Sequence, residues 1–300
     1  MNKNNNILIV GGTGFIGYHL SKKLLKKGWE VTSISTKKPN KKRYIKEVKY
    51  LFCDIANKQS LKNNIKNYFR YVVNLGGYVD HSNKQKTYKS HFLGCKNLVE
   101  ILLKNPPESF VQMGSCVEYG RLKSPQKENQ RCKPLTIYGK AKLAATKYLL
   151  QLNKKNNFPS IIIRLYLAYG PKQDVNRFLP IIIEGCIKDK KFACSEGNQF
   201  RDFVHVDDVV NFIIMSLNNK RARGQIFNIG SGKPKKIKDI IKNVKKISNG
   251  GKPQFGKIKL RKDEILKIYP SIKKAKKIIK WTPKISFSKG IKNTINSYEK

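Results

Sequence analysis

Acidic residues are scarce in this chain of 300 residues, because 19 Asp and Glu face 63 Lys and Arg, a formal net charge of +44. Histidine is scarce too, and its four residues show no paired spacing such as H-E-x-x-H, so we expect no metal site. The six cysteines contain no Cys-x-x-Cys pair, and we expect reduced thiols. No apolar run approaches the roughly 20 residues of a membrane helix, and residues 7–10 are too short for a signal-peptide core. We therefore expect a soluble cytoplasmic protein without a membrane partner.

The excess of positive charge has two interpretations. It is either a device for binding nucleic acid or a bias of composition, since Lys, Asn and Ile are abundant along the whole chain, as an AT-rich genome would give. The basic residues dot predicted helix faces, as in residues 22–27, and form no recognisable nucleic-acid-binding module. We favour the compositional interpretation and expect no specific nucleic-acid partner. The charge would still help to attract an anionic substrate.

Short apolar runs alternate with longer amphipathic ones along the chain. The runs that predict strands are residues 7–10, 30–34, 48–52, 71–75, 110–113, 160–165 and 226–229. Predicted helices lie between most of them, for example at residues 19–27, 90–104 and 138–152. This alternation, with strands that are apolar on both faces, predicts an α/β fold built on a doubly wound parallel sheet.

Three glycines, Gly11, Gly14 and Gly17, follow the first predicted strand and open the first helix with the spacing G-x-x-G-x-x-G. Glycines there allow a tight turn and a close approach of the backbone to a pyrophosphate at the helix N-terminus, where N–H groups favour anions. The strand before and the helix after distinguish a dinucleotide loop from a simple turn. We expect an NAD(P)-binding Rossmann domain of residues 1–165 with the late strand near 226–229, and a smaller, discontinuous substrate-binding domain of residues 166–300.

The second predicted strand ends without the acidic residue that commonly binds the adenosine ribose. Ser35 and Lys37 stand there instead, which favours NADP over NAD, although lysines are frequent everywhere in this chain. Asp54, after the third strand, is either an adenine contact or a helix or turn cap. The cofactor-binding residues that we predict are Gly11, Thr13, Gly14, Phe15, Ile16, Gly17, Ser35, Lys37, Asp54, Ile55, Leu75, Gly76, Tyr138 and Lys142.

Tyr138 and Lys142 form Y-x-x-x-K on a predicted helix, where residues four apart share a face. A phenol with an ordinary pKa of about 10 is a poor acid or base at neutral pH, and we expect the neighbouring ammonium to lower that pKa. Lys142 is also expected to hold the nicotinamide ribose. Ser115, at the end of the fifth predicted strand, would hydrogen-bond the reacting oxygen, with a simple strand-end turn as the alternative.

These motifs together resemble the extended short-chain dehydrogenases/reductases of the nucleotide-sugar epimerase/dehydratase family. The resemblance runs nearly from end to end and includes residues 74–77, 164–171, 197–209, 227–232 and 281–283. It implies that Ser115, Tyr138 and Lys142 are a catalytic triad acting on a nucleotide-linked sugar, and that the chain forms a homodimer. It further implies that Ser115 and Cys116 contact the substrate, whose diphosphate Arg201 and Arg261 would bind.

Departures from the family pattern narrow the reaction. Dehydratases of the family carry an acid/base pair directly after the Ser or Thr, where this chain has Cys116 and Val117. Glu118 is one position further, and one step along an extended segment points a side chain to the other face. We therefore disfavour a 4,6-dehydratase. Leu167 and His91 stand where the family usually has Asn.

Two reactions remain. Residues 164–210 and 255–264 look most similar to 4-ketoreductases of the CDP-abequose synthase type, so our main interpretation is NADPH-dependent reduction of a 4-keto-6-deoxyhexose nucleotide, with Tyr138 protonating the alkoxide. The alternative is a 4-epimerase in which tightly bound NAD removes a hydride from C4 and returns it to the opposite face. A non-catalytic cofactor-binding protein is a third interpretation, which the intact triad disfavours. The resemblance also implies a role in polysaccharide biosynthesis.

Overall fold

Seven strands form one parallel sheet in the computed structural model, which describes residues 5–78, 80, 82–260 and 264–298. Their order across the sheet is β11-β6-β5-β4-β1-β2-β3. The strands are β1 (Asn6–Val10), β2 (Glu30–Ser35), β3 (Lys49–Phe52), β4 (Tyr71–Asn74), β5 (Ser109–Ser115), β6 (Ser160–Leu165) and β11 (Gln225–Ile229). The strand order reverses between β1 and β4, so a ligand crevice is expected outside their carboxyl ends. The predicted doubly wound parallel sheet is confirmed.

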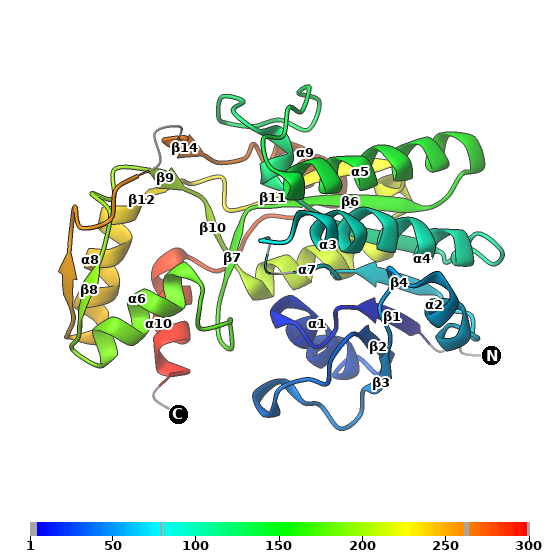
Figure 1. Cartoon of the computed structure of the whole chain (residues 1–300), viewed down its shortest axis with the longest axis horizontal. Coiled ribbons are helices and arrows are strands. Elements are labelled where there is room, and N and C mark those ends of the chain that lie inside the picture. The colour runs from blue at the N-terminus through cyan, green and yellow to red at the C-terminus, as the bar shows by residue number, and fades with distance from the viewer. Residues whose placement is uncertain (1–4, 79, 81, 261–263, 299–300) are drawn as a thin grey trace.

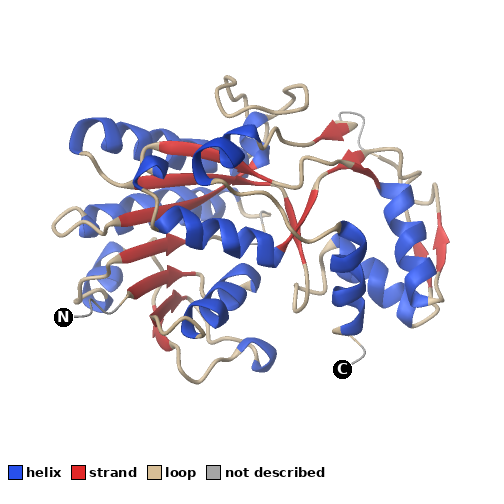
Figure 2. Ribbon diagram, turned by 180° about the vertical axis from the view of Figure 1, so that it is seen from behind, coloured by secondary structure: helices blue, strands red, loops and turns tan. Residues whose placement is uncertain are grey.

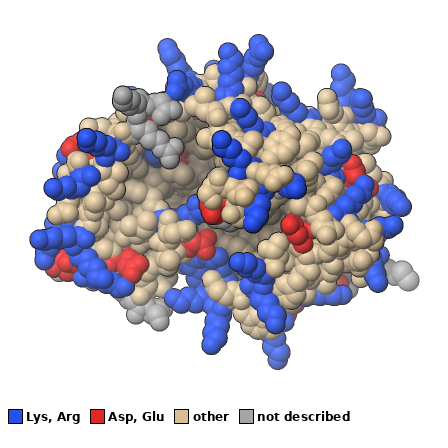
Figure 3. All heavy atoms as spheres, in the orientation of Figure 1, with Lys and Arg blue, Asp and Glu red and all other residues tan. Residues whose placement is uncertain are grey.

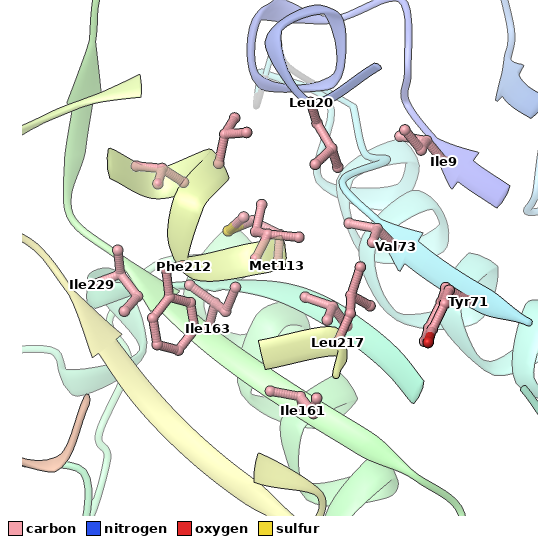
Figure 4. Packing of buried hydrophobic residues seen from close by; sticks show 14 of the residues in the cluster. Ile9, Leu20, Tyr71, Val73, Met113, Ile161, Ile163, Phe212, Leu217 and Ile229 are labelled. Atoms are coloured by element: carbon pink, nitrogen blue, oxygen red, sulfur yellow. The ribbon is translucent and has the colours of Figure 1, made fainter. Parts of the chain in front are cut away.

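Helices cover both faces of the sheet (Figures 1 and 2). One face carries α1 (Phe15–Leu25), α7 (Val206–Leu217) and α9 (Lys273–Ile279), and the other carries α2 (Lys58–Asn64), α4 (Gly94–Leu102) and α5 (Ile137–Asn156). Successive side chains of β1 point to opposite faces of the sheet, which explains why each face has its own apolar core. Ile7 and Ile9 belong to the first core, and Leu8 and Val10 belong to the second. Figure 4 shows the first core, where Leu20 of α1 and Phe212 of α7 lie over the strands.

Between β4 and α4 the chain forms a short α3 (Lys84–Tyr88) and then a π-helix, η2 (Lys89–Leu93). The single helix predicted at residues 90–104 is therefore divided into two segments. The predicted start of the first helix at residue 19 was also wrong, because α1 begins at Phe15, directly after the glycine loop. The loop glycines hide this start, since they carry no apolar periodicity.

A smaller unit follows β6 and contains three helices, α6 (Phe178–Ile187), α8 (Ile237–Ser248) and α10 (Phe287–Asn296). Short strands complete it or join it to the sheet, namely β7 (Leu167–Tyr169), β8 (Lys191–Ala193), β9 (Phe200–Arg201), β10 (Phe203–His205), β12 (Lys235–Lys236), β13 (Lys252–Gln254) and β14 (Lys267–Ile268). It has its own apolar core, to which Ile183, Val244 and Ile291 contribute. Figure 3 shows a hollow in the surface between this unit and the sheet unit.

Two helices that follow residue 165 pack on the sheet rather than in the smaller unit. Val209 and Phe212 of α7 and Ile279 of α9 share a core with Ile7 of β1. The boundary that we predicted at residue 165 stays a prediction. We propose that the sheet unit also takes in α7 and α9, in addition to β11, because burial of apolar side chains defines a domain better than position along the chain.

Candidate active site

The glycine loop joins the end of β1 to the first turn of α1. Gly11 has a φ of +79°, and a Cβ at Gly17 would lie 2.4 Å from the Gly11 carbonyl oxygen. The position before α1 is Gly14, where no side chain caps the helix, and its first turn holds no acidic residue. Backbone N–H groups at such a helix end are available to an anionic ligand. The loop therefore fits the pyrophosphate of a dinucleotide.

The carboxyl ends of β2 and β4 complete this crevice. Thr13 Oγ1 donates a hydrogen bond of 3.0 Å to Ser35 Oγ at the end of β2. A Cβ at Gly11 would lie 3.1 Å from the Gly76 backbone nitrogen, just after β4. The structure thus brings the predicted residues Gly11, Thr13, Ser35 and Gly76 together on the expected edge of the sheet.

Other members of the predicted cofactor set make local contacts. The Asp54 carboxylate accepts a hydrogen bond of 2.9 Å from the Ala56 N–H, which is the turn-cap alternative. Ile55 is buried and approaches Gly94, at which a Cβ would lie 2.6 Å from its Cγ1. Lys37 is exposed beyond β2. Phe15, Ile16 and Leu75 are partly buried against the sheet core. A role for these residues in binding the cofactor stays a prediction.

Ser115, Tyr138 and Lys142 meet at the end of β5. Ser115 is the last residue of this strand, and the other two lie one turn apart on the first turns of α5. A Cβ at Gly139 would lie 2.9 Å from the Val117 carbonyl oxygen, so this glycine permits the close approach of α5. A hydrogen bond links Ser115 with Tyr138, and Lys142 Nζ lies 5.8 Å from the centre of the Tyr138 ring. The three side chains therefore occupy one site.

The electrostatics of this site differ from our expectation for Tyr138. Burial raises the pKa of the Tyr138 phenol to about 12, although the hydrogen bond with Ser115 acts in the lowering direction. Burial also lowers the pKa of Lys142 to about 8. Its ammonium donates a hydrogen bond of 2.6 Å to the Met113 carbonyl rather than to the phenol. The pKa of Tyr138 is thus raised and not lowered as predicted, because burial outweighs the effects that act in the lowering direction.

His91 and Arg177 also act on Tyr138 and were not among the predicted site residues. His91, in the π-helix η2, packs its ring against Tyr138 with 4.8 Å between ring centres and 69° between ring planes. The sequence signal was the His in place of the family's Asn, and π-helices occur frequently at functional sites. Arg177, at the N-terminus of α6, contributes a positive charge that lowers the Tyr138 pKa. We find no sequence signal that would have identified Arg177.

The predicted substrate residues Cys116 and Arg201 lie close enough that each influences the pKa of the other. Burial raises the pKa of the Cys116 thiol to about 12, so Cys116 stays protonated at neutral pH. Burial lowers the pKa of Arg201, whose guanidinium forms an ion pair with Glu264. Arg261, the other predicted ligand of the diphosphate, falls outside the described residues.

The positions after Ser115 form a 3₁₀ helix, η3 (Cys116–Tyr119), rather than the extended segment that we assumed. Its third residue, Glu118, is completely buried and pairs with Arg164 of β6, while Val117 is partly exposed. Neither Cys116 nor Val117 carries a carboxyl group that could serve as a dehydratase acid or base.

In the part of the chain that the structure describes, no cluster of His, Cys, Asp and Glu could hold a metal ion, and no helix is long and apolar enough to span a membrane.

The sequence model of the NAD dependent epimerase/dehydratase family matches residues 7–230. The chain belongs to this family. A protein of Methanocaldococcus jannaschii, named as a candidate UDP-glucose 4-epimerase, is 30% identical over 97% of both chains. The UDP-glucose 4-epimerase of Thermotoga maritima, solved with UDP-glucose, has a TM-score of 0.91 at 24% identity, with 98% of each chain covered. The UDP-glucose 4-epimerase of Thermus thermophilus, solved with NAD, has a TM-score of 0.89 at 21% identity, covering 98% of this chain and 99% of that one.

Membership of the epimerase/dehydratase family makes the chain an enzyme of nucleotide-sugar metabolism with an NAD(P)-binding Rossmann domain. The predicted resemblance to extended short-chain dehydrogenases/reductases is thereby confirmed. The likeness to the two solved epimerases shows the shared fold, including the smaller unit, because both alignments span nearly the whole chain.

Proposed function

We propose that this family member is a nucleotide-sugar 4-epimerase that keeps its NAD bound between turnovers. The observation that carries the proposal is an assembled Ser115, Tyr138 and Lys142 site next to two residues, Cys116 and Val117, that cannot do the acid/base work of dehydration. The Methanocaldococcus relative supports epimerisation over the 4-keto reduction that was our main interpretation from the sequence. The reductase stays a prediction that rests on Lys37 after β2 and on the resemblance of residues 164–210 to 4-ketoreductases.

The side chains have distinct proposed roles. NAD, when bound in the glycine-loop crevice, supplies the chemistry of accepting a hydride from C4 and returning it. As the phenolate, Tyr138 would take the proton of the C4 hydroxyl, and as the phenol it would give that proton back, while Ser115 hydrogen-bonds the same oxygen and holds it beside Tyr138. Because burial raises the pKa of Tyr138 to about 12, this role requires the pKa to fall in the substrate complex. Lys142 places an ammonium beneath Tyr138, where it stabilises negative charge that develops on the phenol. The two hydroxyls are already hydrogen-bonded, so little rearrangement is needed to engage a substrate oxygen.

We propose NAD rather than NADP as the cofactor, and a nucleoside diphosphate sugar as the substrate. The solved Thermus epimerase is a complex with NAD, and the Thermotoga epimerase contains UDP-glucose. Arg201, which lies near Cys116, would bind the diphosphate in place of its present partner Glu264. A role for Arg261, a homodimer and a cytoplasmic location stay predictions.

The decisive experiment is an assay of the nucleotide that the protein carries. Purified protein is denatured, and the released NAD(H) and NADP(H) are quantified; intact protein is then given UDP-glucose, and UDP-galactose is measured without added cofactor. Near-stoichiometric NAD and turnover without added cofactor are expected. An empty protein that binds NADPH and reduces a 4-keto-6-deoxy sugar nucleotide would overturn the proposal in favour of the reductase. Lys37, exposed beyond β2, would then be the first candidate ligand of the 2′-phosphate.

A further inference from the structure

A completely buried carboxylate lies directly beneath the candidate active site. Glu118 Oε1 accepts a hydrogen bond of 2.9 Å from the Ser115 backbone N–H. Glu118 Oε2 accepts two further hydrogen bonds of 3.0 Å, from the Thr146 hydroxyl and from Arg164 Nε. These three donors belong to the end of β5, to α5 and to β6. One side chain therefore ties together the elements that carry Ser115, Tyr138 and Lys142.

The Glu118 carboxylate packs closely against the backbone next to Ser115. A Cβ at Gly114 would lie 2.4 Å from Glu118 Oε1, so only glycine lets the carboxylate reach the end of β5. The Ser115 hydroxyl in turn accepts a hydrogen bond of 3.4 Å from the Val117 N–H, which completes a capping box around the first turn of η3. The orientation of the Ser115 side chain is thus fixed by a turn that Glu118 closes.

Stability alone is a weak reason for a buried ion pair between Glu118 and Arg164. Removing two charges from water is expensive, and replacing such a pair with apolar residues is often neutral or stabilising. The geometry gives the carboxylate another task, since Thr146 stands one helical turn beyond Lys142 and shares its face of α5. The same carboxylate that fixes Ser115 therefore also fixes the part of α5 that presents Tyr138 and Lys142.

We propose that Glu118 is a positioning residue, which holds the Ser115 hydroxyl beside Tyr138 by closing the turn at the end of β5. This inference rests on the catalytic role proposed for Ser115, but the contact that it concerns exists without substrate. Glu118 acts through Ser115 and through the backbone, and it does not touch the reacting atoms. Its negative charge also opposes the effect of burial on the Lys142 ammonium.

Glu118→Gln is the sharpest variant, because it keeps the size of the side chain and changes one acceptor oxygen into an amide donor. All three partners of Glu118 present donors to it, namely the Ser115 N–H, the Thr146 hydroxyl and Arg164 Nε. The Thr146 hydroxyl can rotate to accept, but the other two cannot. Either orientation of the amide therefore sets an NH₂ group against an N–H donor, and the turn that carries Ser115 loosens.

The test is a double-mutant cycle read by the titration of Tyr138. Absorbance difference spectra against Tyr138→Phe in each background give the fraction of phenolate near pH 11 in the protein as purified. In the wild type, Ser115→Ala should reduce this fraction several-fold, because the hydrogen bond from Ser115 favours the phenolate. In the Glu118→Gln background, Ser115→Ala should change the phenolate fraction of Tyr138 little, because the Ser115 hydroxyl is no longer held beside Tyr138. The cycle cancels the direct influence of the Glu118 charge on Tyr138.

A kinetic version of the cycle uses UDP-glucose. We expect Glu118→Gln to reduce kcat by roughly 10- to 100-fold with KM changed less than about threefold, and to add little to the loss caused by Ser115→Ala. Equal effects of Ser115→Ala in both backgrounds would overturn the proposal. The spectroscopic cycle needs no substrate, so it remains decisive even if UDP-glucose is not turned over and the proposed function fails.

Asp208→Asn is the matched control. Asp208 is also a buried carboxylate, and it accepts backbone hydrogen bonds from Lys284 at 2.9 Å and Ile285 at 3.0 Å, in the first turn of α7. Asp208→Asn should lower stability without changing the effect of Ser115→Ala on Tyr138. If Glu118→Gln does not fold, Glu118→Asp serves instead, because a shorter carboxylate cannot reach both Ser115 and Arg164. An unchanged cycle in that variant would equally contradict the proposal.

Discussion

At the scale of single residues, Lys142 shows a conflict between function and stability. Its side chain is only 3% exposed, and burial lowers its pKa to about 8. Below pH 8 the ammonium is charged in both the folded and the unfolded chain, so the full cost of burying it is present. Between pH 8 and about 10.5 the unfolded chain binds the proton more strongly, and the free energy of unfolding therefore rises with pH.

Replacing this lysine should accordingly stabilise the protein while it abolishes activity. We expect Lys142→Met to raise the free energy of unfolding by about 1–3 kcal/mol at pH 7, the upper figure being the cost that the pKa shift implies and the lower one allowing for the lost hydrogen bond to Met113. The gain should shrink steadily as the pH rises from 8 to 10.5. Urea unfolding of both proteins at pH 7 and pH 10 measures it. A gain that does not change with pH would show that the buried charge is not its origin.

Tyr138 is the residue whose loss should affect turnover most selectively. The phenol is buried and hydrogen-bonded to Ser115, while its ring packs against His91. Tyr138→Phe keeps the ring contact and removes only the hydroxyl. We expect kcat to fall by roughly 10²–10⁴-fold, the usual contribution of a positioned acid/base group, with NAD content unchanged. Rates with UDP-glucose and the NAD released on denaturation measure both effects. A variant with more than a tenth of wild-type activity would remove Tyr138 from its proposed role.

At the scale of elements, we expect the link between β1 and α1 to control cofactor binding. A Cβ at Gly17 would lie 2.4 Å from the Gly11 carbonyl oxygen and 2.6 Å from the Gly12 Cα, and backbone atoms cannot move aside as a flexible side chain can. We expect Gly17→Ala to open the loop and to weaken NAD binding at least tenfold, as measured by isothermal titration of stripped protein.

Gly28 supplies the control for this prediction. It ends the segment after α1 with a φ of +73°, and a Cβ there would meet no atom within 4 Å. Gly28→Ala should therefore lower stability by about 1 kcal/mol, because of its backbone conformation, and leave NAD affinity unchanged. If both variants lost NAD affinity equally, general destabilisation and not the loop geometry would be the cause.

The same scale shows why the sequence predicted some of the site and missed the rest. Ser115, Tyr138 and Lys142 are predictable because a strand end and a helical spacing of four each fix a direction. We predicted correctly that the Glu118 side chain points away from the reacting groups, but for the wrong reason. We assumed an extended segment, whereas a 3₁₀ turn carries Glu118 inward to Arg164. The spacing Ser115-x-x-Glu118 is a local capping-box signature that could have indicated this turn, whereas the ion pair with Arg164 depends on β6 and has no local pattern.

The raised pKa of Tyr138 was missed for a related reason. Sequence spacing places Lys142 beside Tyr138, but it does not say how deeply the pair is buried or that the Met113 carbonyl takes the ammonium. Burial outweighs the neighbouring charge in this site, and burial is a property of the packed elements. The contact with His91 likewise depends on the packing of the π-helix η2 against α5, which is a property of the folded elements.

At the scale of the whole molecule, the net charge of +44 bears on the capture of substrate. Figure 3 shows Lys and Arg side chains over much of the face that holds the hollow between the two units, with some Asp and Glu side chains near its rim. A nucleoside diphosphate sugar is an anion, so this field should raise its local concentration and its rate of association. Added salt shortens the range of the field from about 10 Å at 0.1 M to about 3 Å at 1 M.

We therefore expect KM for UDP-glucose to rise several-fold between 0.05 and 0.5 M NaCl while kcat stays nearly constant, because chemistry inside the site is shielded from bulk ions. Initial rates at each salt concentration measure this, and thermal melting over the same series excludes unfolding as the cause. The distinction also tests whether the charge is only a bias of composition. A KM independent of salt would mean that the lysines around the hollow do not guide the substrate, and that the diphosphate is recognised solely by contacts within the site such as Arg201.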